Sequence, residues 1–313
     1  MATSRTPKPP VVERNSGSPV AVPPSALVVA GAGCLSASAV FVKLAEVNAG
    51  TAAFLRCAIA MAALAPLAVR ECRRHGRPDR AVQCCALAAG VFLGVDYALW
   101  TASILGVGAA IATVLNNVQV IAFPLLARIF GGTPIARRFL IACPVMLAGI
   151  ALASGALSED PHATHQLLGS ALGVASGIAY AAYLHLSRLS GTRNPRHVVT
   201  PVCVATGAAT AVTGILGAAT TGITARLPAA SWGWLVALAL LGQVAAWLLL
   251  ATATPKLAPG TSAALLLLHP VLAVALGLLV LRETPTTSQL VGCAVVIIAV
   301  WFAHRAPRDR RSG

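Results

Sequence analysis

Residues 81–103 read AVQCCALAAGVFLGVDYALWTAS, a run in which Asp96 is the only charged side chain. A helix of about 20 apolar residues is long enough to cross the hydrocarbon core of a bilayer. A carboxylate inside such a helix is costly unless it faces protein or a water-filled cavity. The stretch therefore predicts a transmembrane helix, and Asp96 is the first candidate functional residue.

The composition extends this interpretation to the whole chain. Of 313 residues, 57% are apolar and 10% are charged, whereas soluble domains average about 25% charged residues. The mean hydropathy is +0.80. These values predict an all-α, polytopic membrane protein. The net charge of +14 then fits basic loops at an anionic membrane surface, and nucleic acid is not needed as a partner.

Ten apolar stretches of near-spanning length follow one another, and we predict one transmembrane helix for each. The first half holds Ser25–Val47, Gly50–Val69, Ala81–Ser103, Gly108–Ile129 and Ala136–Gly155. The second half holds Leu168–Ser187, Val198–Thr220, Trp232–Thr252, Thr261–Leu281 and Ser288–His304. Residues 1–24 predict a disordered cytoplasmic tail, because they are polar and rich in proline, and residues 305–313 form a basic cytoplasmic tail.

The basic residues set the orientation of these ten spans. With the N-terminus inside, 19 Lys and Arg side chains fall in cytoplasmic segments, and only Arg226 and Arg282 fall in outer loops. Positive charge collects on the cytoplasmic side of membrane proteins. We therefore predict a multi-pass protein of the plasma membrane with both termini in the cytoplasm.

The two halves of the chain repeat each other at an offset of 151 residues. The segment Thr101–Ile104, TASI, meets Thr252–Pro255, TATP, and Gly132-Thr133-Pro134 meets Glu283-Thr284-Pro285. Each half has an odd number of spans, so the halves would insert with opposite topology. Inverted repeats with a site between the halves are a common transporter design.

Several features in this order resemble the EamA-type members of the drug/metabolite transporter superfamily. They are Lys43 late in the first span, Arg56 early in the second, the turns Gly106–Ala109 and Pro259–Ser262, and Arg282-Glu283 after the ninth. The resemblance implies ten helices in two inverted five-helix EamA-like repeats, over residues 25–155 and 168–304. It also implies secondary export of amino acids, metabolites or drugs. The chain departs from the family at two places in the first half. Gly131-Gly132 stands where the family usually has Gly-Glu, and Gln119 stands where a proline is usual in the fourth span. Pro270 keeps the matching proline in the ninth span.

Charged side chains inside the spans are the main candidates for substrate binding or coupling. Asp96, Lys43 and Arg56 all fall within about 10 Å of the predicted membrane midplane, so the three charges are at a similar depth. They predict a substrate or proton site in a central cavity, or else a fixed ion pair that orders the bundle. Lys43 also has the helical spacing to pair with Glu46 at the outer mouth.

Polar and aromatic side chains at similar depth extend the candidate site. Asn116 and Gln119 share one helix face and Asn117 is turned by about 100°, and these amides predict cavity lining or interhelical hydrogen bonds. His269 precedes Pro270 and predicts a substrate contact, a proton relay or a neutral interhelical hydrogen bond. Trp247 matches Asp96 at the repeat offset, and with Trp100 and Tyr183 it offers aromatic surface, for the cavity or for packing.

Small residues predict close contacts between helices. Gly90 and Gly94 lie on one face of the third span, and Gly169, Gly173 and Gly177 lie on one face of the sixth. Such spacing lets two helix backbones approach closely in a membrane. Glu283 at the outer boundary predicts a cap or gate of the outer mouth, or simply a solvated loop charge.

The sequence contains no motif of an enzyme, a metal site or a cofactor site. A Walker loop, H-E-x-x-H and G-x-S-x-G are all missing, and the eight cysteines lack C-x-x-C spacing. We therefore predict a secondary transporter, not an enzyme, that exports a small molecule by alternating access and uses protons if Asp96 is the coupling group. A lipid-handling, flippase-like protein and a non-transporting scaffold are the alternatives. The substrate and the oligomeric state do not follow from the sequence.

Overall fold

A computed structural model describes residues 22–131, 137–153, 163–194, 196–253, 256–257, 265–266 and 268–304. Within these ranges all regular elements are helices and there is no strand. The all-α class predicted from the sequence is therefore observed. The tail predicted over residues 1–24 falls outside the described residues except for its last three, and the basic tail over 305–313 falls outside them entirely.

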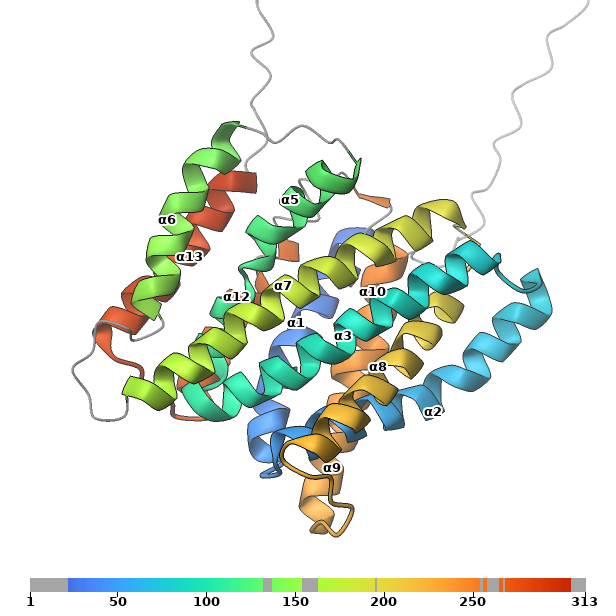
Figure 1. Cartoon of the computed structure of the whole chain (residues 1–313), viewed down its shortest axis with the longest axis horizontal. Helices are drawn as coiled ribbons and strands as arrows, with labels where there is room; N and C mark the ends of the chain where they lie inside the picture. The colour runs from blue at the N-terminus through green and yellow to red at the C-terminus, as the bar shows by residue number, and fades with distance from the viewer. Residues whose placement is uncertain are drawn as a thin grey trace, which may run out of the picture.

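The first half of the chain forms six helices in order (Figure 1). They are α1 (Pro24–Leu44), α2 (Ala49–His75), α3 (Arg80–Val107), α4 (Ala109–Asn116), α5 (Gln119–Gly131) and α6 (Arg137–Ala153). The second half forms α7 (Ala163–Arg193), α8 (Val199–Ala219), α9 (Ala229–Ala239), the π-helix η1 (Leu240–Ala245), α10 (Ala246–Ala253), α12 (Leu268–Leu279) and α13 (Thr287–His304).

Seven of the described helical segments are long and apolar enough to cross a membrane. Three further apolar helices are shorter, at Cys143–Ala153, Leu268–Leu279 and Thr287–Ala299. These three lie in the fifth, ninth and tenth predicted spans, and the first part of the ninth span falls outside the described residues. The structure thus shows a multi-pass helical membrane protein.

Two of the predicted spans are interrupted. The fourth is split into α4 and α5 by a turn at Asn117 and Val118, where Val118 N–H bonds to Leu115 O as in a tighter helix. The eighth consists of α9, η1 and α10, with the π-helical turn in its middle. Interruptions at membrane depth are tolerated where protein surrounds the backbone, and π-helical turns often occur at functional sites.

The helices of the two halves are interleaved. Helix α3 packs along α7 and α8, whereas α1 packs along α9, η1, α10 and α12. The pairs α2 with α8, α4 with α12 and α6 with α13 also join one half to the other (Figure 1). The interior is therefore built from both halves together.

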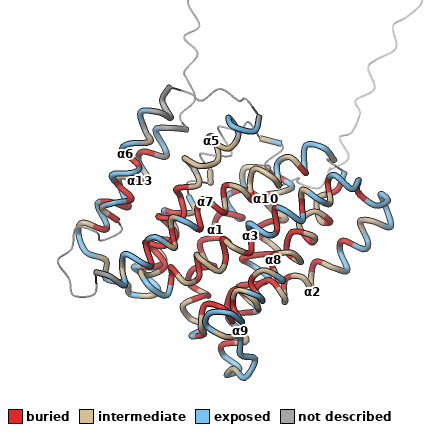
Figure 2. Tube along the Cα trace, viewed as in Figure 1, coloured by how far each residue is buried: buried red, intermediate tan, exposed pale blue. Residues whose placement is uncertain are grey.

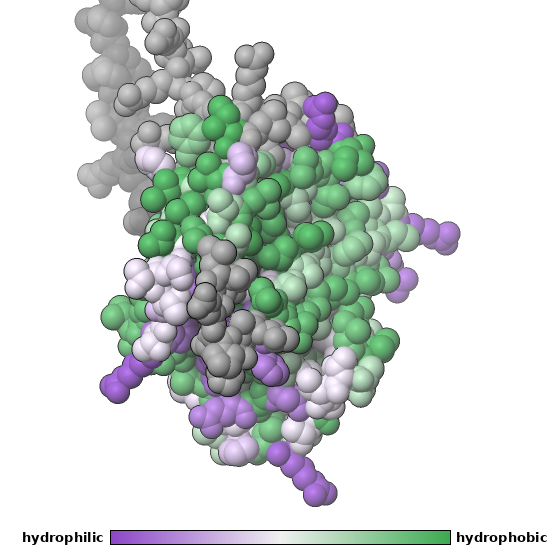
Figure 3. Space-filling view, turned by 60° about the vertical axis from the view of Figure 1, so that its left-hand side comes forward, coloured by the Kyte–Doolittle hydropathy of each residue, from purple (hydrophilic) through white to green (hydrophobic). Residues whose placement is uncertain are grey.

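Burial and hydropathy agree with a lipid-facing exterior. Buried residues follow the inward sides of α1, α3, α7 and α8 (Figure 2). Large apolar side chains such as Ile129, Phe130 and Leu279 are exposed on the outside, and one face of the molecule is covered by a broad apolar area with polar groups toward its margins (Figure 3). Lipid tails would cover such a surface without the penalty that water imposes.

The glycine pairs lie at close helix contacts, as predicted. A Cβ added at Gly90 would collide with the Ala205 carbonyl oxygen of α8, and one at Gly94 would lie 2.7 Å from Val212 Cβ. A Cβ at Gly177 of α7 would collide with the Asn116 carbonyl oxygen. Gly90 and Gly94 therefore let α3 pack closely on α8. Gly177 lets α7 pack closely on the break between α4 and α5.

Candidate functional site

A small central pocket of about 30 Å³ lies between the two halves. It is lined by Leu35 and Ser38 of α1, Arg56 of α2, Asp96, Tyr97 and Trp100 of α3, Asn116 of α4, Tyr180 of α7, Trp247 of α10 and His269 of α12. This volume has room for only a few water molecules, since one water needs about 10–15 Å³ of such space. The conformation is therefore closed around the centre.

Arg56 presents unused hydrogen-bond donors to this pocket. Its side chain is 2% exposed, and Nη2 donates to the carbonyl oxygen of Gly242 in η1 at 2.9 Å. Its Nε and Nη1 have no hydrogen-bond partner. The guanidinium carbon lies 3.8 Å from the ring centroid of Tyr97 and 5.6 Å from that of Trp100, which is a favourable place for a cation. Aromatic faces thus hold the charge while two guanidinium nitrogens, Nε and Nη1, stay without an acceptor.

Asp96 is buried and is held by an amide. Asn116 Nδ2 donates to Asp96 Oδ1 at 3.0 Å and also lies 2.8 Å from Ser176 Oγ of α7. Among the described residues Arg56 donates to Gly242 and makes no hydrogen bond to Asp96. The fixed pair between these two residues, one of the alternatives left open by the sequence, is therefore not formed in this conformation.

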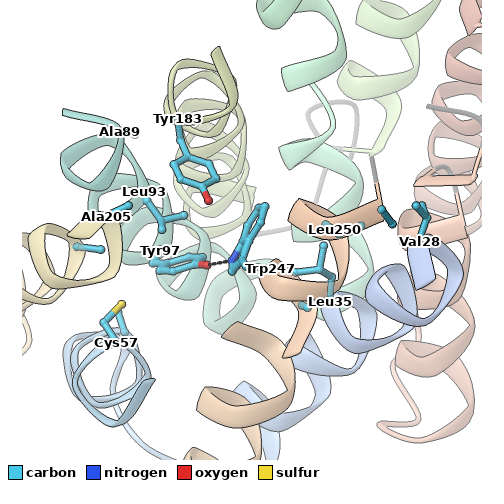
Figure 4. Close-up of a cluster of buried hydrophobic side chains, with 14 residues drawn as sticks. Val28, Leu35, Cys57, Ala89, Leu93, Tyr97, Tyr183, Ala205, Trp247 and Leu250 are labelled. Atoms are coloured by element: carbon cyan, nitrogen blue, oxygen red, sulfur yellow. Dashed lines mark hydrogen bonds between the residues drawn. The ribbon is translucent and has the colours of Figure 1, made fainter. Parts of the chain in front are cut away.

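A hydrogen-bonded aromatic network forms one wall of the pocket (Figure 4). Trp247 Nε1 donates to the Tyr97 hydroxyl at 2.9 Å, and this hydroxyl donates to Gln243 Oε1. Gln243 Nε2 in turn donates to Thr206 Oγ1 of α8 at 3.2 Å. The Tyr183 ring packs edge-on against Trp247, with centroids 5.0 Å apart. The network joins α3, η1, α10, α8 and α7.

Six of the residues proposed from the sequence come together at the pocket. They are Arg56, Asp96, Trp100, Asn116, Trp247 and His269. The ring of His269 lines the pocket, and its backbone carbonyl accepts from Ser36 Oγ of α1 at 3.0 Å. The repeat offset that paired Trp247 with Asp96 therefore pointed to two residues of the same pocket.

The other four proposed residues do not line the pocket. Lys43 is half-buried in the last turn of α1. Asn117 donates to Thr113 O of its own helix at 2.8 Å, as its 100° offset from Asn116 allows. Gln119 begins α5, where its Oε1 has no hydrogen-bond partner, and Tyr183 is buried against Trp247 and Tyr180.

Sequence reasoning missed several residues of the site. Leu35 and Ser38 line the pocket, and Ser176 and Thr206 accept hydrogen bonds from Asn116 and Gln243. A small polar residue within an apolar span, such as Ser38, is a weak signal for a cavity. The π-helical turn around Gly242 and Gln243 has no clear sequence signal beyond the glycine itself, to which α1 comes so close that an added Cβ would collide with Ser38 Oγ.

Two carboxylates outside the pocket cap helices of the opposite half. Glu283 accepts from the backbone N–H groups of Ala109 and Ala110, at 2.6 and 3.1 Å, and so caps α4. Glu71 accepts from the N–H groups of Val198, Val199 and Thr200, at 2.9, 3.0 and 2.7 Å, and so caps α8. Free N–H groups at a helix start favour a carboxylate. Glu283 is therefore a helix cap, a role that neither sequence alternative named.

Nothing in the described part of the chain gathers metal ligands. No group of three or more His, Cys, Asp or Glu side chains comes together there, and the eight cysteines are free. The chemistry available at the central pocket is hence ionic, aromatic and hydrogen-bonding.

Together, the apolar helices and the closed pocket of charged and aromatic side chains fit a membrane transporter, and the comparisons with known proteins give the same class. Residues 24–155 and 167–304 each match the EamA-like transporter family, and the chain belongs to this family. It is 25% identical over 281 residues to an uncharacterized transporter of Archaeoglobus fulgidus, covering 90% of this chain and 96% of that protein. A solved crystal structure of a protein aligns with a TM-score of 0.60 and 15% identity, over 90% of this chain and 99% of the other, and supports the fold. The resemblance inferred from the sequence is confirmed.

Proposed function

We propose that this transporter is a secondary active exporter of a small metabolite, amino acid or drug-like compound that carries a carboxylate. It would work by alternating access in the plasma membrane, with ten spans, two inverted five-helix repeats and both termini in the cytoplasm. Arg56 carries the proposal. A buried guanidinium with two unused donors in a pocket matches the two oxygens of a carboxylate, which Arg binds with paired hydrogen bonds.

The packing of the helices supports two inverted repeats. If the spans are numbered in order, the second packs on the seventh, the fourth on the ninth and the fifth on the tenth. The first packs on the eighth as the third packs on the sixth. Exchanging the halves leaves this set of contacts unchanged, as a two-fold relation between them requires.

The size of the pocket supports alternating access. A cavity of about 30 Å³ has no room for a metabolite, whereas small-molecule sites usually measure roughly 300–1,000 Å³. Substrate binding therefore requires the halves to separate on one side. The interruptions in the fourth and eighth spans lie beside Asn116 and Gln243, so a change there would reach the site directly.

Proton coupling is the part of the proposal that rests on Asp96. This carboxylate is 4% exposed and shares the pocket with Arg56 without an ion pair between them. A carboxylate in such a position is a natural site of proton exchange in transporters. Uptake of a proton by Asp96 would change the charge that the substrate meets beside Arg56.

The first experiment compares spent medium from strains that make the wild type, Asp96→Asn, Arg56→Lys, or no transporter. Arg70→Gln is the matched control, because Arg70 is exposed on the same helix as Arg56 and lies outside the pocket. Membrane levels of each variant are checked. We expect a carboxylate-bearing compound to be enriched by the wild type and Arg70→Gln and depleted at least tenfold for Arg56→Lys.

The compound found is then tested with protein reconstituted in vesicles. Export that follows an imposed pH gradient in the wild type but not in Asp96→Asn supports proton coupling. If the export rate of the wild type does not depend on the gradient, proton coupling is wrong. If no compound is enriched, the exporter proposal fails. Transfer of a fluorescent phospholipid between leaflets by the same vesicles would then favour the lipid-handling alternative.

A further inference from the structure

A second pocket lies outside the central site, where the turn from α2 to α3 meets the turn from α7 to α8 (right-hand side of Figure 1). Its volume is about 360 Å³, within the range of small-molecule sites. It is lined by His75, Arg77, Asp79, Arg193, Asn194, Arg196 and His197. One side of this pocket thus comes from the first half of the chain and the other from the second.

The lining has a strong excess of positive charge. Three arginines, Arg77, Arg193 and Arg196, line the pocket together with a single acidic residue, Asp79. Within the described part of the chain none of the three is in an ion pair with a carboxylate, and Arg193 Nη1 makes only a 3.5 Å contact with Cys85 Sγ. The guanidinium groups therefore keep most of their donors free for a ligand.

His197 gives the pocket a buried polar atom without a partner. The side chain is 5% exposed, and its Nε2 donates to the carbonyl oxygen of Gly76 at 3.0 Å. Its Nδ1 is buried and has no hydrogen-bond partner. A carbonyl oxygen only accepts, so Nε2 carries the proton of the neutral ring, and the lone pair of Nδ1 can accept from an O–H group of a ligand. Such an unused buried atom is rare in a folded protein unless a ligand or water meets it.

The backbone around the pocket is fixed from both halves. Glu71 holds the start of α8, directly after His197, through three backbone N–H groups. Gly76, whose carbonyl oxygen holds His197, has a φ of +80° that closes the end of α2. The Asn194 carbonyl and side chain accept from the N–H groups of His197 and Arg196. The backbone segments that carry the three arginines are therefore held by contacts between the two halves.

We propose that this pocket binds a phosphate group, supplied by an anionic lipid headgroup or by a soluble phosphate compound. Phosphate offers several acceptor oxygens and at least one full negative charge, which suits a pocket lined by three arginines. The charge distribution along the chain predicts that this end of the bundle is cytoplasmic, where anionic lipids are abundant and basic pockets bind their headgroups. The site is independent of the central pocket and of the substrate exported there.

The test uses the full-length chain purified in detergent, with two probes and matched variants. The probes are a short-chain phosphatidic acid and inorganic phosphate, with short-chain phosphatidylcholine as the lipid control. The pocket variant is Arg77→Gln, Arg193→Gln and Arg196→Gln combined. The control variant is Arg73→Gln, Arg74→Gln and Arg80→Gln combined, which removes the same charge from exposed residues near the same end that do not line the pocket. His197→Gln keeps an Nε2 donor for Gly76 and lacks Nδ1.

Binding is measured by native mass spectrometry and by the shift in Tm with ligand concentration. We expect the pocket variant to raise the Kd for the binding probe at least tenfold, His197→Gln to raise it severalfold, and the control variant to change it less than twofold. Binding of phosphatidic acid alone identifies a lipid headgroup as the source, and binding of inorganic phosphate that competes with the lipid identifies a soluble one. Equal losses in the pocket and control variants, or no binding of either probe by the wild type, would overturn the proposal.

Discussion

At the scale of single residues, the central site depends on which polar atoms find a partner. The Tyr97 hydroxyl is bonded on both sides, by Trp247 Nε1 and by Gln243 Oε1. Phe at this position would keep the ring beneath Arg56 but leave both partners buried and unpaired. Each such loss costs about 1–3 kcal/mol, so we expect Tyr97→Phe to lower the Tm of the purified protein clearly.

Tyr180→Phe is the control for this prediction. Tyr180 lines the same pocket and packs against Tyr183 and Trp247, but no hydrogen bond of its hydroxyl occurs among the described residues. Its Tm should stay close to that of the wild type. Equal values for the two variants would show that the network around Tyr97 adds no stability.

The capping carboxylates give a second prediction at this scale. Gln in place of Glu71 or Glu283 removes the negative charge and replaces one of the two accepting oxygens with an NH2 group, which cannot accept. Backbone N–H groups at the start of α8 or α4 then lose a partner. We expect Glu71→Gln and Glu283→Gln each to lower the unfolding free energy by about 1–2 kcal/mol, measured by thermal or denaturant unfolding in detergent. Glu46→Gln, an exposed carboxylate without such a role, should leave stability unchanged. A loss of the same size there would point to net charge instead.

The central-site residues that the sequence could predict are those that lipid would penalise. Arg56 and Asp96 were found because charge within an apolar span must face protein or water. The partner of Asp96, Asn116, was itself a candidate. The partner of Arg56 was not predictable, since Gly242 lies far along the chain and contributes an ordinary backbone carbonyl. Lys43 shares the depth of Arg56 but lies outside the pocket, because depth alone does not fix the direction of a side chain around its helix.

At the scale of helices, apolar length predicted where helices occur but not where they break. Pro66, Pro124 and Pro144 all lie inside helices, and the interruption of the fourth span falls at Asn117 and Val118 instead. Neighbouring helices can satisfy the backbone at either kind of position. The break lies at a close tertiary contact, the approach of Gly177 to Asn116, which the sequence of a single helix does not reveal.

The close contact between α3 and α8 leads to a third prediction. Gly90→Ala would place a methyl group on the Ala205 carbonyl oxygen and force the two helices apart. Overpacking of this kind costs typically about 1–3 kcal/mol, so we expect a lower Tm and a broader elution profile. Gly33→Ala is the matched control, because a Cβ there meets nothing within 4 Å, and alanine in a helix is favoured by about 0.5–1 kcal/mol. If both variants behave alike, α3 and α8 are not in close contact.

At the scale of the whole molecule, two kinds of information shaped the prediction. Hydropathy and charge gave the helical class and the family resemblance, because the bilayer imposes simple rules on every segment. Hydropathy and charge do not predict which helices pair across the halves, since each pair depends on the fit of side chains more than a hundred residues apart. The repeat offset is the sequence feature that came nearest to predicting a contact between the halves, because it matched Trp247 to Asp96 and both line the central pocket.

The orientation of the whole chain gives the last prediction. If all ten spans cross the membrane with the N-terminus inside, Arg226 is external and Arg196 is cytoplasmic, and both are exposed. In intact cells, a membrane-impermeant maleimide should label Arg226→Cys above the level of the unsubstituted chain, and should label Arg196→Cys only after permeabilisation. A green fluorescent protein fused after Gly313 should fluoresce, because the C-terminus is then inside. The reverse labelling pattern would contradict the predicted orientation. An external C-terminus would mean that one of the three short helices does not cross the membrane. The two halves could then not be inverted copies of each other.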